Sequence, residues 1–503
     1  MKTRSSARGE PRRLGNAALL ALMLCSVVAL SLIRGRFAPI VTTAGDAIKS
    51  EDDAAAAAVA VSKAAAVNVD TGDGADEAAA EAAADLNLNW DFAGPAEEKD
   101  KEEVQPKPAA DGSRGGAAKP VCYETSRRSD TCEAAGDVRV LGSSQTVYVD
   151  SLDREWKTKP YCRKHDNFAL AHVKEWSLKP LPSGAAPQCT VNSSATAFVL
   201  STGGFTGNPF HDYTDVLIPA FITAHPLRGE VQFLVSSYKS WWMNRYIQIF
   251  QQMSRHEVVD IDADDEVRCY RNVVVGPTFH RELGVDASKS PSPGYSTADF
   301  RKMLRDAFGL ERATATPSGD RWDIRRRPRL LIISRRPSRG RAFMNERAMA
   351  DMAASLGFDV RIGEPDSSTD TSKFARLVNS CDVMVGVHGA GLTNMVFLPA
   401  GAVVVQVVPY GRLEWLARNT FAEPSAGMEV HYLEYVVQLD ETTLSEQYPS
   451  DHPVLRDPMA IHKQGWNALK TTYLDKQNVR PHLGRLKNTF LQALKMLPHG
   501  RDD

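Results

Sequence analysis

Short runs of β-branched apolar residues recur through the second half of the chain. Arg329–Ile333, Val383–Val387 and Ala402–Val408 are three of them, and polar loops separate them from segments with helical spacing of apolar residues. Continuous apolar runs of this length are typical of strands buried on both faces of a parallel sheet. The pattern predicts strand, loop, short helix and strand between residues 382 and 409, preceded by a strand and a helix from residue 329.

The middle of the chain has a similar pattern. Thr196–Leu200 and Val231–Val235 are predicted strands, and residues 208–221 between them show helical spacing. Two overlapping Asp-x-Asp patterns at Asp260, Asp262 and Asp264 predict an acidic hairpin tip, with a Mn²⁺ site as the alternative. We therefore predict two α/β domains, covering residues 121–320 and 328–503, with further helices in the tail of the second.

The first 120 residues have a different character. Leu14–Ile33 is a run of 20 residues without a charge, and five basic residues precede it. A helix of that length crosses the roughly 30 Å hydrocarbon core of a bilayer. We predict a cytosolic tail of residues 1–13 and an uncleaved type II anchor, with a cleaved signal peptide as the alternative. Residues 34–120 are rich in Ala, Asp, Glu, Gly and Pro, which predicts a disordered stem.

Composition and cysteine content add few constraints. The chain has 503 residues, 43% of them hydrophobic, and a net charge of −2, so nothing suggests nucleic-acid binding. Beyond the anchor lie six cysteines, an even number that permits disulfides in a lumenal protein. Cys122 and Cys132 are close enough to pair across a short loop, whereas Cys381 is predicted to be a free, buried thiol. Asn192 begins a glycosylation sequon, which should be exposed.

Polar loops at the ends of two predicted strands carry candidate phosphate ligands. Residues 335–341 contain four arginines in seven positions, and such a cluster favours an anion such as a diphosphate. In the other loop, Gly389 and Gly391 let backbone N–H groups approach a phosphate, and the following helix adds its positive N-terminal end. The alternatives are a solvated charged surface and a tight turn that binds no ligand.

The first predicted domain carries candidate groups for sugar chemistry. His211 and Asp215 are four residues apart and share a helix face, where they either face a cleft or form a structural pair. Trp241 and Trp242 follow a strand end, where they either stack on the sugar rings of a polysaccharide or cover the core.

Several of these segments resemble glycosyltransferase family 61. The similar features are Ile333-Ser-Arg-Arg336, the segment from Arg341 to Asn345-Glu346, and His388-Gly-Ala-Gly-Leu-Thr-Asn394. Residues 208–215 look like the amino-terminal signature of the family. The resemblance covers roughly residues 121–500, and the nearest similarity is to the plant enzymes that decorate xylan.

The resemblance implies a GT-B fold, in which two Rossmann-like domains face each other across a cleft. It implies inverting transfer of a pentose, arabinofuranose or xylose, from a UDP-sugar to a xylan backbone. One of His211 and Asp215 would be the general base. Trp241, Trp242 and His280 are expected on the acceptor side, although Pro277 and Thr278 depart from the family pattern. Expected donor contacts are Arg335, Arg336, Arg341, Asn345, Glu346, His388, Gly389, Ala390, Gly391, Leu392, Asn394 and Gln406.

The same resemblance, together with the anchor, implies a Golgi membrane protein with a lumenal catalytic domain that could join a glycosyltransferase complex. No metal or cofactor is expected, because the arginines can neutralise the leaving diphosphate. Other functions stay open: a β-1,2-xylosyltransferase of N-glycans, a transferase for other wall polymers, or a non-catalytic sugar-binding Golgi protein.

Overall fold

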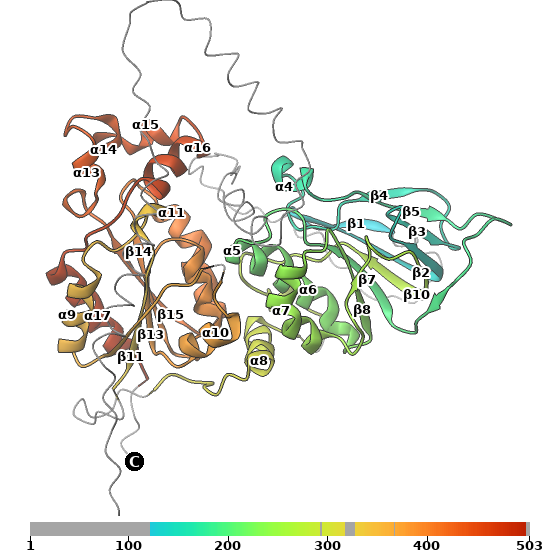
Figure 1. Ribbon diagram of the computed structural model, residues 1–503, viewed down its shortest axis with the longest axis horizontal. Helices are drawn as coiled ribbons and strands as arrows, with labels where there is room; N and C mark the ends of the chain where they lie inside the picture. Colours follow the sequence, from blue (N-terminus) through green and yellow to red (C-terminus); the bar gives the residue numbers. More distant parts are fainter. Residues whose placement is uncertain (1–120, 292–293, 317–326, 367, 499–503) are drawn as a thin grey trace, which may run out of the picture. The chain divides into compact units, whose positions relative to one another are not determined.

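The computed structural model describes residues 121–291, 294–316, 327–366 and 368–498. The predicted cytosolic tail, anchor and stem lie outside these residues. No helix in the described ranges has both the length and the apolar character needed to cross a bilayer. The described part is a mixed α/β protein with two separate sheets, one formed by earlier and one by later strands of the chain (Figure 1).

The first sheet has ten strands and is mixed. Its centre contains β10 (Val267–Val275), β7 (Thr196–Ser201) and β8 (Val231–Ser236), which are parallel, and β2 (Ser129–Leu141), which is antiparallel to β10. The predicted strands at 196–200 and 231–235 are therefore confirmed. The remaining strands are β1 (Cys122–Ser126), β3 (Thr146–Val149), β4 (Trp156–Thr158), β5 (Trp176–Pro180), β6 (Val191–Asn192) and β9 (Val259–Asp260).

The prediction of an acidic hairpin at residues 260–266 is wrong. The strand β9 pairs in parallel with β8, and both β8 and β7 lie between β9 and β10 in the same sheet, so the segment is a crossover loop. The carboxylate of Asp262 accepts a hydrogen bond from the Ser236 hydroxyl at 3.1 Å and lies 3.0 Å from Lys174 Nζ. Asp264 forms an ion pair with Arg268 at 2.6 Å. These acidic side chains are used to hold the loop against the sheet.

The second sheet has five parallel strands. Their order is β12 (Asp359–Gly363), β11 (Arg329–Ile333), β13 (Val383–Val387), β14 (Val403–Val408) and β15 (His431–Val436). The apolar runs that predicted β11, β13 and β14 are thus confirmed as neighbouring buried strands. The chain moves from β11 to β12 on one side and then to β13 on the other. Open parallel sheets bind ligands at such a reversal, outside the carboxyl ends of the strands.

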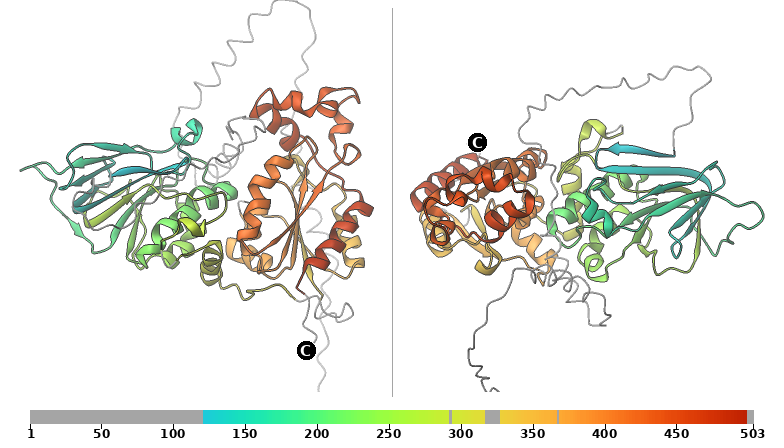
Figure 2. Two further views of the ribbon diagram at one scale, coloured as in Figure 1. Left: turned by 180° about the vertical axis from the view of Figure 1, so that it is seen from behind. Right: turned by 90° about the horizontal axis from the view of Figure 1, so that it is seen from above.

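Helices cover both faces of the second sheet. The helix α9 (Glu346–Ser355) and the last helix, α17 (Leu483–Met496), pack side by side on one face, and α10 (Thr371–Asn379) lies on the other (Figures 1 and 2). The helix α7 (Ser240–Met253), which follows β8, packs against α8 (Thr297–Phe308), which lies between the two sheets in sequence. Short helices fill the rest: α4 (Asn167–Ala171), α11 (Glu414–Ala417), α12 (Glu423–Gly427), α13 (Leu444–Gln447), α14 (Pro453–Arg456), α15 (Pro458–His462) and α16 (Trp466–Leu469).

The predicted helix at residues 208–221 forms, with an irregularity at its centre. It consists of α5 (Pro209–His211), a π-helical turn η1 (Asp212–Leu217) and α6 (Ile218–Ala224). Pro219 lacks the N–H that would bond the carbonyl four residues earlier, so the helix widens ahead of it. Such π-turns occur often at functional sites.

The cysteine predictions agree with the structure. Cys122 and Cys132 form a disulfide, as their spacing predicted, and Cys189 pairs with Cys269. Cys381 is a free, fully buried thiol, as expected. The side chain of Asn192 is exposed on β6, so the sequon is accessible.

Candidate functional site

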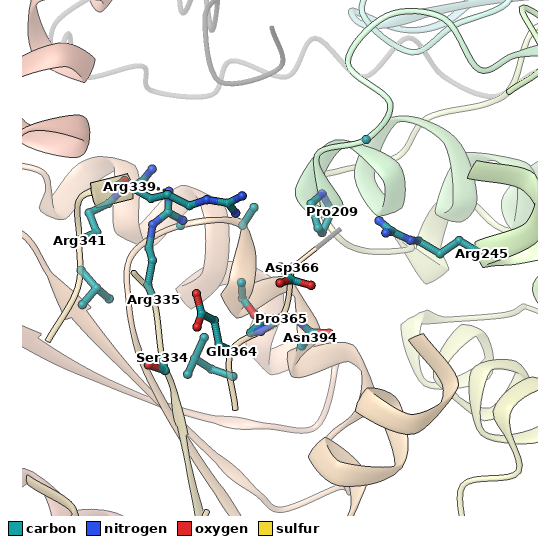
Figure 3. Close-up of a pocket in the computed structure, with 16 residues that line it drawn as sticks. Pro209, Arg245, Ser334, Arg335, Arg339, Arg341, Glu364, Pro365, Asp366 and Asn394 are labelled. Carbon is teal, nitrogen blue, oxygen red and sulfur yellow. Dashed lines mark hydrogen bonds between the residues drawn. The ribbon is translucent and has the colours of Figure 1, made fainter. Parts of the chain in front are cut away.

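Two pockets meet at the loop that follows β13. The first, which we call the arginine pocket, encloses about 110 Å³. It is lined by Gly207, Pro209, Arg245, Ile333, Ser334, Arg335, Arg339, Arg341, Glu364, Pro365, Asp366, Val387, Gly389, Ala390, Gly391 and Asn394 (Figure 3). The second, the histidine pocket, is lined by Asn208, Phe210, His211, Arg341, His388, Gly389, Ala390, Leu416, Thr420, Phe421, Trp466, Lys470 and Leu474. The two pockets share Arg341, Gly389 and Ala390.

Arg341 is the buried charge at the junction of the pockets. Its side chain is 7% exposed, and its Nη1 donates to the carbonyl oxygen of His388 at 3.3 Å. Its Nε is buried without a hydrogen-bond partner, and no carboxylate among the described residues forms an ion pair with it. A buried cation is costly unless an anion pairs with it. The site is therefore suited to an anionic ligand.

The backbone around Arg341 is held by the far end of the chain. Arg341 has a φ of 58°, which is unfavourable for a residue with a side chain. Its N–H donates to the Gln477 carbonyl at 2.6 Å, and a Cβ on Gly340 would come within 2.3 Å of the Asp475 carbonyl oxygen. The C-terminal segment thus imposes this conformation and directs the guanidinium to the junction.

The loop of residues 388–391, which we call the glycine loop, lies against the Arg341 guanidinium. A Cβ on Gly389 would lie 2.8 Å from Arg341 Nη1, so any larger residue would displace the arginine. After Gly389 the 3₁₀ helix η6 (Ala390–Phe397) begins. The first N–H groups of a helix have no partner within the helix and can bind an anion. The amide of Asn394 donates back to the Gly391 carbonyl at 2.9 Å and closes the turn.

His388 is a neutral hydrogen-bond donor. The Gln406 amide Nε2 lies 2.6 Å from His388 Nδ1, and the Gln406 oxygen accepts from the Tyr432 hydroxyl at 2.7 Å. The amide therefore donates to Nδ1, and the proton of the ring sits on Nε2. Burial and the nearby Arg341 lower the pKa of His388 to about 3. Gln406, which we expected among the donor contacts, is fully buried, lines neither pocket and positions His388.

The four arginines of the loop after β11 (residues 335–341, the arginine loop) fall into two groups. Arg335 and Arg339 line the arginine pocket together with Arg341 (Figure 3). Arg336 does not line it: its guanidinium is 58% exposed and pairs with Glu364 at 3.0 Å and Asp366 at 3.3 Å. Of the three arginines expected to contact the donor, the structure thus places Arg335 and Arg341 at the pocket and Arg336 outside it, and it adds Arg339 to the lining. The Arg336 pairs instead hold the two carboxylates at the pocket wall.

Opposite the arginines, His211 and Asp215 form a buried network with residues from an earlier loop. The Asp215 carboxylate is fully buried, and its Oδ2 lies 2.8 Å from His211 Nδ1. The same oxygen accepts from Arg163 Nε at 2.9 Å and from the Tyr161 hydroxyl at 3.0 Å. The predicted pair thus exists, and the structure brings only His211 to a pocket wall.

The network favours the neutral form of the His211 imidazole. Burial lowers the pKa of His211, with a further contribution from Arg163. Burial alone would raise the pKa of Asp215, but Arg163 and His211 outweigh it and hold that pKa well below its usual range. His211 Nδ1 lies 2.8 Å from Asp215 Oδ2 and 3.1 Å from Arg163 Nη2, which can only donate. In the tautomer with the proton on Nδ1, His211 donates to the ionised Asp215 and a lone pair remains on Nε2. This arrangement of a carboxylate behind a histidine is the one used to orient a general base.

Two further π-turns form the opposite wall of the histidine pocket. They are η7 (Arg418–Ala422), which carries Thr420 and Phe421, and η9 (Lys470–Asp475), which carries Lys470 and Leu474. Pro424 explains the first, because it removes a helical N–H as Pro219 does in η1. The Lys470 ammonium is 8% exposed and lies 2.8 Å from Asp475.

Several predicted contacts lie away from both pockets. Trp242 is fully buried and its Nε1 donates to Asp212 at 2.7 Å, so it covers the core and cannot stack on a sugar. Trp241 packs against the core edge, with the Arg245 guanidinium 5.9 Å from its ring centre. Leu392 is buried under the glycine loop. Asn345 bonds the Pro481 carbonyl, and Glu346 begins α9.

His280 lies in a separate hollow. Its Nδ1 accepts a hydrogen bond from the N–H of Asp286 at 3.2 Å, and burial lowers its pKa to about 4.

The site residues that the sequence analysis missed come mostly from segments distant in the chain: Arg163, Arg245, Glu364, Asp366, Trp466 and Lys470. Arg339 alone had a signal, since it belongs to the arginine cluster.

No group of three or more His, Cys, Asp or Glu side chains in the described ranges is arranged to hold a metal ion. Asp262 and Asp264 of the Asp-x-Asp patterns pair with Lys174 and Arg268. Independence from metal remains a prediction for the enzyme assay.

Comparisons with known proteins agree with the motifs. Residues 209–405 match the family model described as Glycosyltransferase 61. The α-1,3-arabinosyltransferase XAT3 of Oryza sativa subsp. japonica is 42% identical over 385 residues, which cover 76% of this chain and 66% of the relative. The β-1,2-xylosyltransferase XYXT1 of the same plant is 39% identical over 396 residues, which cover 75% of this chain and 84% of the relative.

A relative from another plant is also similar. The xylan glycosyltransferase MUCI21 of Arabidopsis thaliana is 34% identical over 391 residues, which cover 74% of this chain and 78% of the relative. For XAT3 and its rice relative XAT2, the match spans slightly less than two thirds of their own length, 66% and 65%.

Proposed function

Because the chain belongs to glycosyltransferase family 61, we propose that it is an inverting transferase that moves a pentose from a UDP-sugar to a xylan backbone. Relatives named as arabinosyl-, xylosyl- and xylan glycosyltransferases support the pentose and the acceptor. Arabinofuranose and xylose are both candidate sugars, because the relatives include a named arabinosyltransferase and a named xylosyltransferase. Decoration of xylan in the plant cell wall is the process that these assignments imply.

The observation that carries the proposal is Arg341, a cation that is 7% exposed and has no carboxylate partner among the described residues. A diphosphate at this position would accept bonds from the guanidinium, from His388 Nε2 and from the first N–H groups of η6. Arg335 and Arg339 line the same pocket and add positive charge. Together they would stabilise the charge that develops on the departing UDP.

The histidine pocket supports the other half of the reaction. A sugar on the diphosphate at Arg341 would enter the histidine pocket, because both pockets share that residue. The acceptor hydroxyl would give its proton to His211 Nε2 as its oxygen bonds the anomeric carbon. The bond from that carbon to the diphosphate would break on the opposite side, which inverts the anomeric configuration. Asp215 would orient His211 and stabilise its protonated form.

We also propose that the two sheets belong to a GT-B arrangement, with residues 121–320 on the acceptor side and 328–503 on the donor side. The support is the parallel second sheet, its switch point between β11 and β13, and pockets lined from both halves of the chain. The charge-free run at residues 14–33 supports a type II anchor in the Golgi membrane. Protease protection of the lumenal part in sealed vesicles tests the anchor.

Transfer and binding assays with the purified protein test the function. UDP-xylose and UDP-arabinofuranose are offered with xylo-oligosaccharides, and NMR of the product gives the anomeric configuration. We expect an inverted linkage, and turnover that persists in EDTA. Arg341→Met should weaken UDP binding about 10- to 100-fold, since it removes a charge-assisted contact of about 1.5–3 kcal/mol.

Other outcomes would identify the alternatives. Activity only with N-glycan acceptors would indicate an N-glycan xylosyltransferase. UDP binding without any transfer would indicate a non-catalytic sugar-binding protein. Loss of turnover in EDTA with recovery in Mn²⁺ would contradict the metal-independent mechanism.

A further inference from the structure

A third hollow lies on the far side of the π-turn η7 from the histidine pocket. Asn419 and Glu423 line this hollow, whereas Thr420 and Phe421 line the histidine pocket. Its other walls are the turn between β1 and β2 and the loop at residues 279–289. That loop is tied to the turn that carries Asp215, because the N–H of Leu283 donates to Thr214 Oγ1 at 3.3 Å. The hollow therefore adjoins the proposed catalytic centre.

Positive charge dominates this hollow, which we call the cationic hollow. Its cationic lining residues are Arg127, Arg128, Arg281 and Lys289, and its carboxylates are Glu282 and Glu423. Arg128 and Glu282 pair with each other. In the part of the chain that the structure describes, Arg127, Arg281 and Lys289 form no ion pair. Because the net charge of the whole chain is −2, this excess of cations is a local feature.

One further carboxylate lies nearby and does not remove the excess. Asp286 accepts bonds from the N–H and hydroxyl of Ser288 at 3.0 Å and 2.7 Å. The hydroxyl bond is the main reason its pKa is lowered, and Lys289 and Arg281 contribute less. Since Asp286 is engaged in this turn and is not part of the lining, the hollow remains open to an external anion.

We propose that the cationic hollow binds carboxylate substituents of the polysaccharide acceptor, so that the enzyme prefers xylan chains that carry uronosyl groups. This inference rests on the proposed function for its acceptor, a xylan chain. With the acceptor hydroxyl at His211, a substituent farther along the chain would pass η7 and reach Arg281 and Lys289. Each exposed cation–carboxylate contact is worth about 1.5- to 5-fold in affinity and weakens with salt.

The test measures acceptor binding without any donor. The probes are xylo-oligosaccharides of one backbone length that carry a single glucuronosyl group, and the same compounds after reduction of the carboxyl group to an alcohol. The two differ in charge and hardly in size. Calorimetry with the purified full chain should show the acidic probe binding about 3- to 10-fold more tightly at low salt. At about 0.5 M NaCl the two affinities should converge.

Variants locate the effect. The double variant Arg127→Glu/Lys289→Glu should lose the preference for the acidic probe. Neither side chain makes an ion pair among the described residues, so the fold should tolerate the change. Lys487→Glu is the matched control, because Lys487 is exposed on α17, lines none of these pockets and has no ion pair in the described ranges. It should keep the wild-type ratio.

Three results would overturn the inference: equal binding of the two probes by the wild type, a ratio unchanged in the double variant, or an equal loss in the control. Failure of the proposed function looks different. A protein that prefers the acidic probe but neither binds UDP nor transfers a sugar would keep the cationic hollow and lose the transferase assignment. A protein that transfers pentose equally to both probes would keep the transferase assignment and lose the cationic hollow.

Discussion

Asp215 and Arg341 are both buried charges near the histidine pocket, but they differ in the partners that surround them. Asp215 is fully buried, and one of its oxygens receives bonds from Tyr161, Arg163 and His211. Arg341 is 7% exposed and has one side-chain hydrogen bond, to a backbone carbonyl. One charge is neutralised within the protein, whereas the other has no counter-charge in the described residues.

The difference separates two kinds of functional residue. A compensated charge contributes to the stability of the fold and sets the protonation state of its neighbour. An uncompensated charge costs stability in the free protein and recovers that cost when an anionic ligand binds. In the proposed mechanism the first kind of site orients the general base, and the second binds the diphosphate. Substitutions at each kind of site can test this division.

Removal of the base should have the largest effect. His211→Ala should lower kcat about 10²- to 10⁴-fold, the usual contribution of a general base. UDP affinity should stay close to that of the wild type, since His211 lines only the histidine pocket. Steady-state kinetics and UDP titration measure both. A variant that folds normally and retains wild-type kcat would exclude His211 as the base.

Removal of the compensating carboxylate should destabilise the fold. Asp215→Asn would leave the buried Arg163 without its partner, which costs about 3–5 kcal/mol in the free energy of unfolding. The carboxylate pKa is held below its usual range, so this stability is present at neutral pH and is lost only as the pH falls through the lowered value. Urea unfolding at pH 7 measures it. A loss under about 1 kcal/mol would show that the network is not compensating.

Removal of the uncompensated cation Arg341 should not lower the free energy of unfolding. Arg341→Met keeps an aliphatic side chain and removes a buried charge without a carboxylate partner. We expect the free energy of unfolding without ligand to be unchanged or higher by about 1–3 kcal/mol. Excess UDP should stabilise the wild type by about 2.7 kcal/mol at 100 times Kd, and the variant much less. A strong loss of stability without ligand would indicate that Arg341 is structural.

The pH profile should reflect the lowered pKa of His211. The base acts only when it is neutral, so kcat/KM should be constant near pH 7 and fall on acidification. Because burial and Arg163 lower the pKa of His211, the midpoint of this fall should lie below the ordinary histidine value of about 6.5. A midpoint above that value would contradict the network described for His211.

The smallest effect is expected at the exposed arginine of the same loop. Arg336→Ala removes pairs with Glu364 and Asp366 from a side chain that is 58% exposed. Exposed pairs contribute about 0.2–1 kcal/mol, so UDP affinity should change by less than about fivefold. Comparison with Arg341→Met, five residues away, tests whether the buried arginine contributes more to UDP affinity than the exposed one. Equal losses in the two variants would remove the distinction.

In the second half of the chain, the strands and the two loops that line the pockets could be predicted from the order of the residues. Continuous β-branched runs predicted β11, β13 and β14, because a strand buried on both faces needs apolar side chains throughout. Parallel strands end at one edge, so the arginine loop and the glycine loop had to meet there. The helical spacing of His211 and Asp215 likewise predicted their contact.

Which arginines of the loop reach the pockets, and which residues surround Asp215, could be seen only in the folded chain. Arg336 and Arg341 belong to one loop. Their environments differ because the backbone of Arg341 is fixed by its hydrogen bond to Gln477, a residue 136 positions later in the chain. Arg163, which lies 52 residues before Asp215, turns a histidine–carboxylate pair into a compensated network. Such pairings depend on how whole elements pack. Local periodicity carries no information about contacts between segments that are distant in the chain.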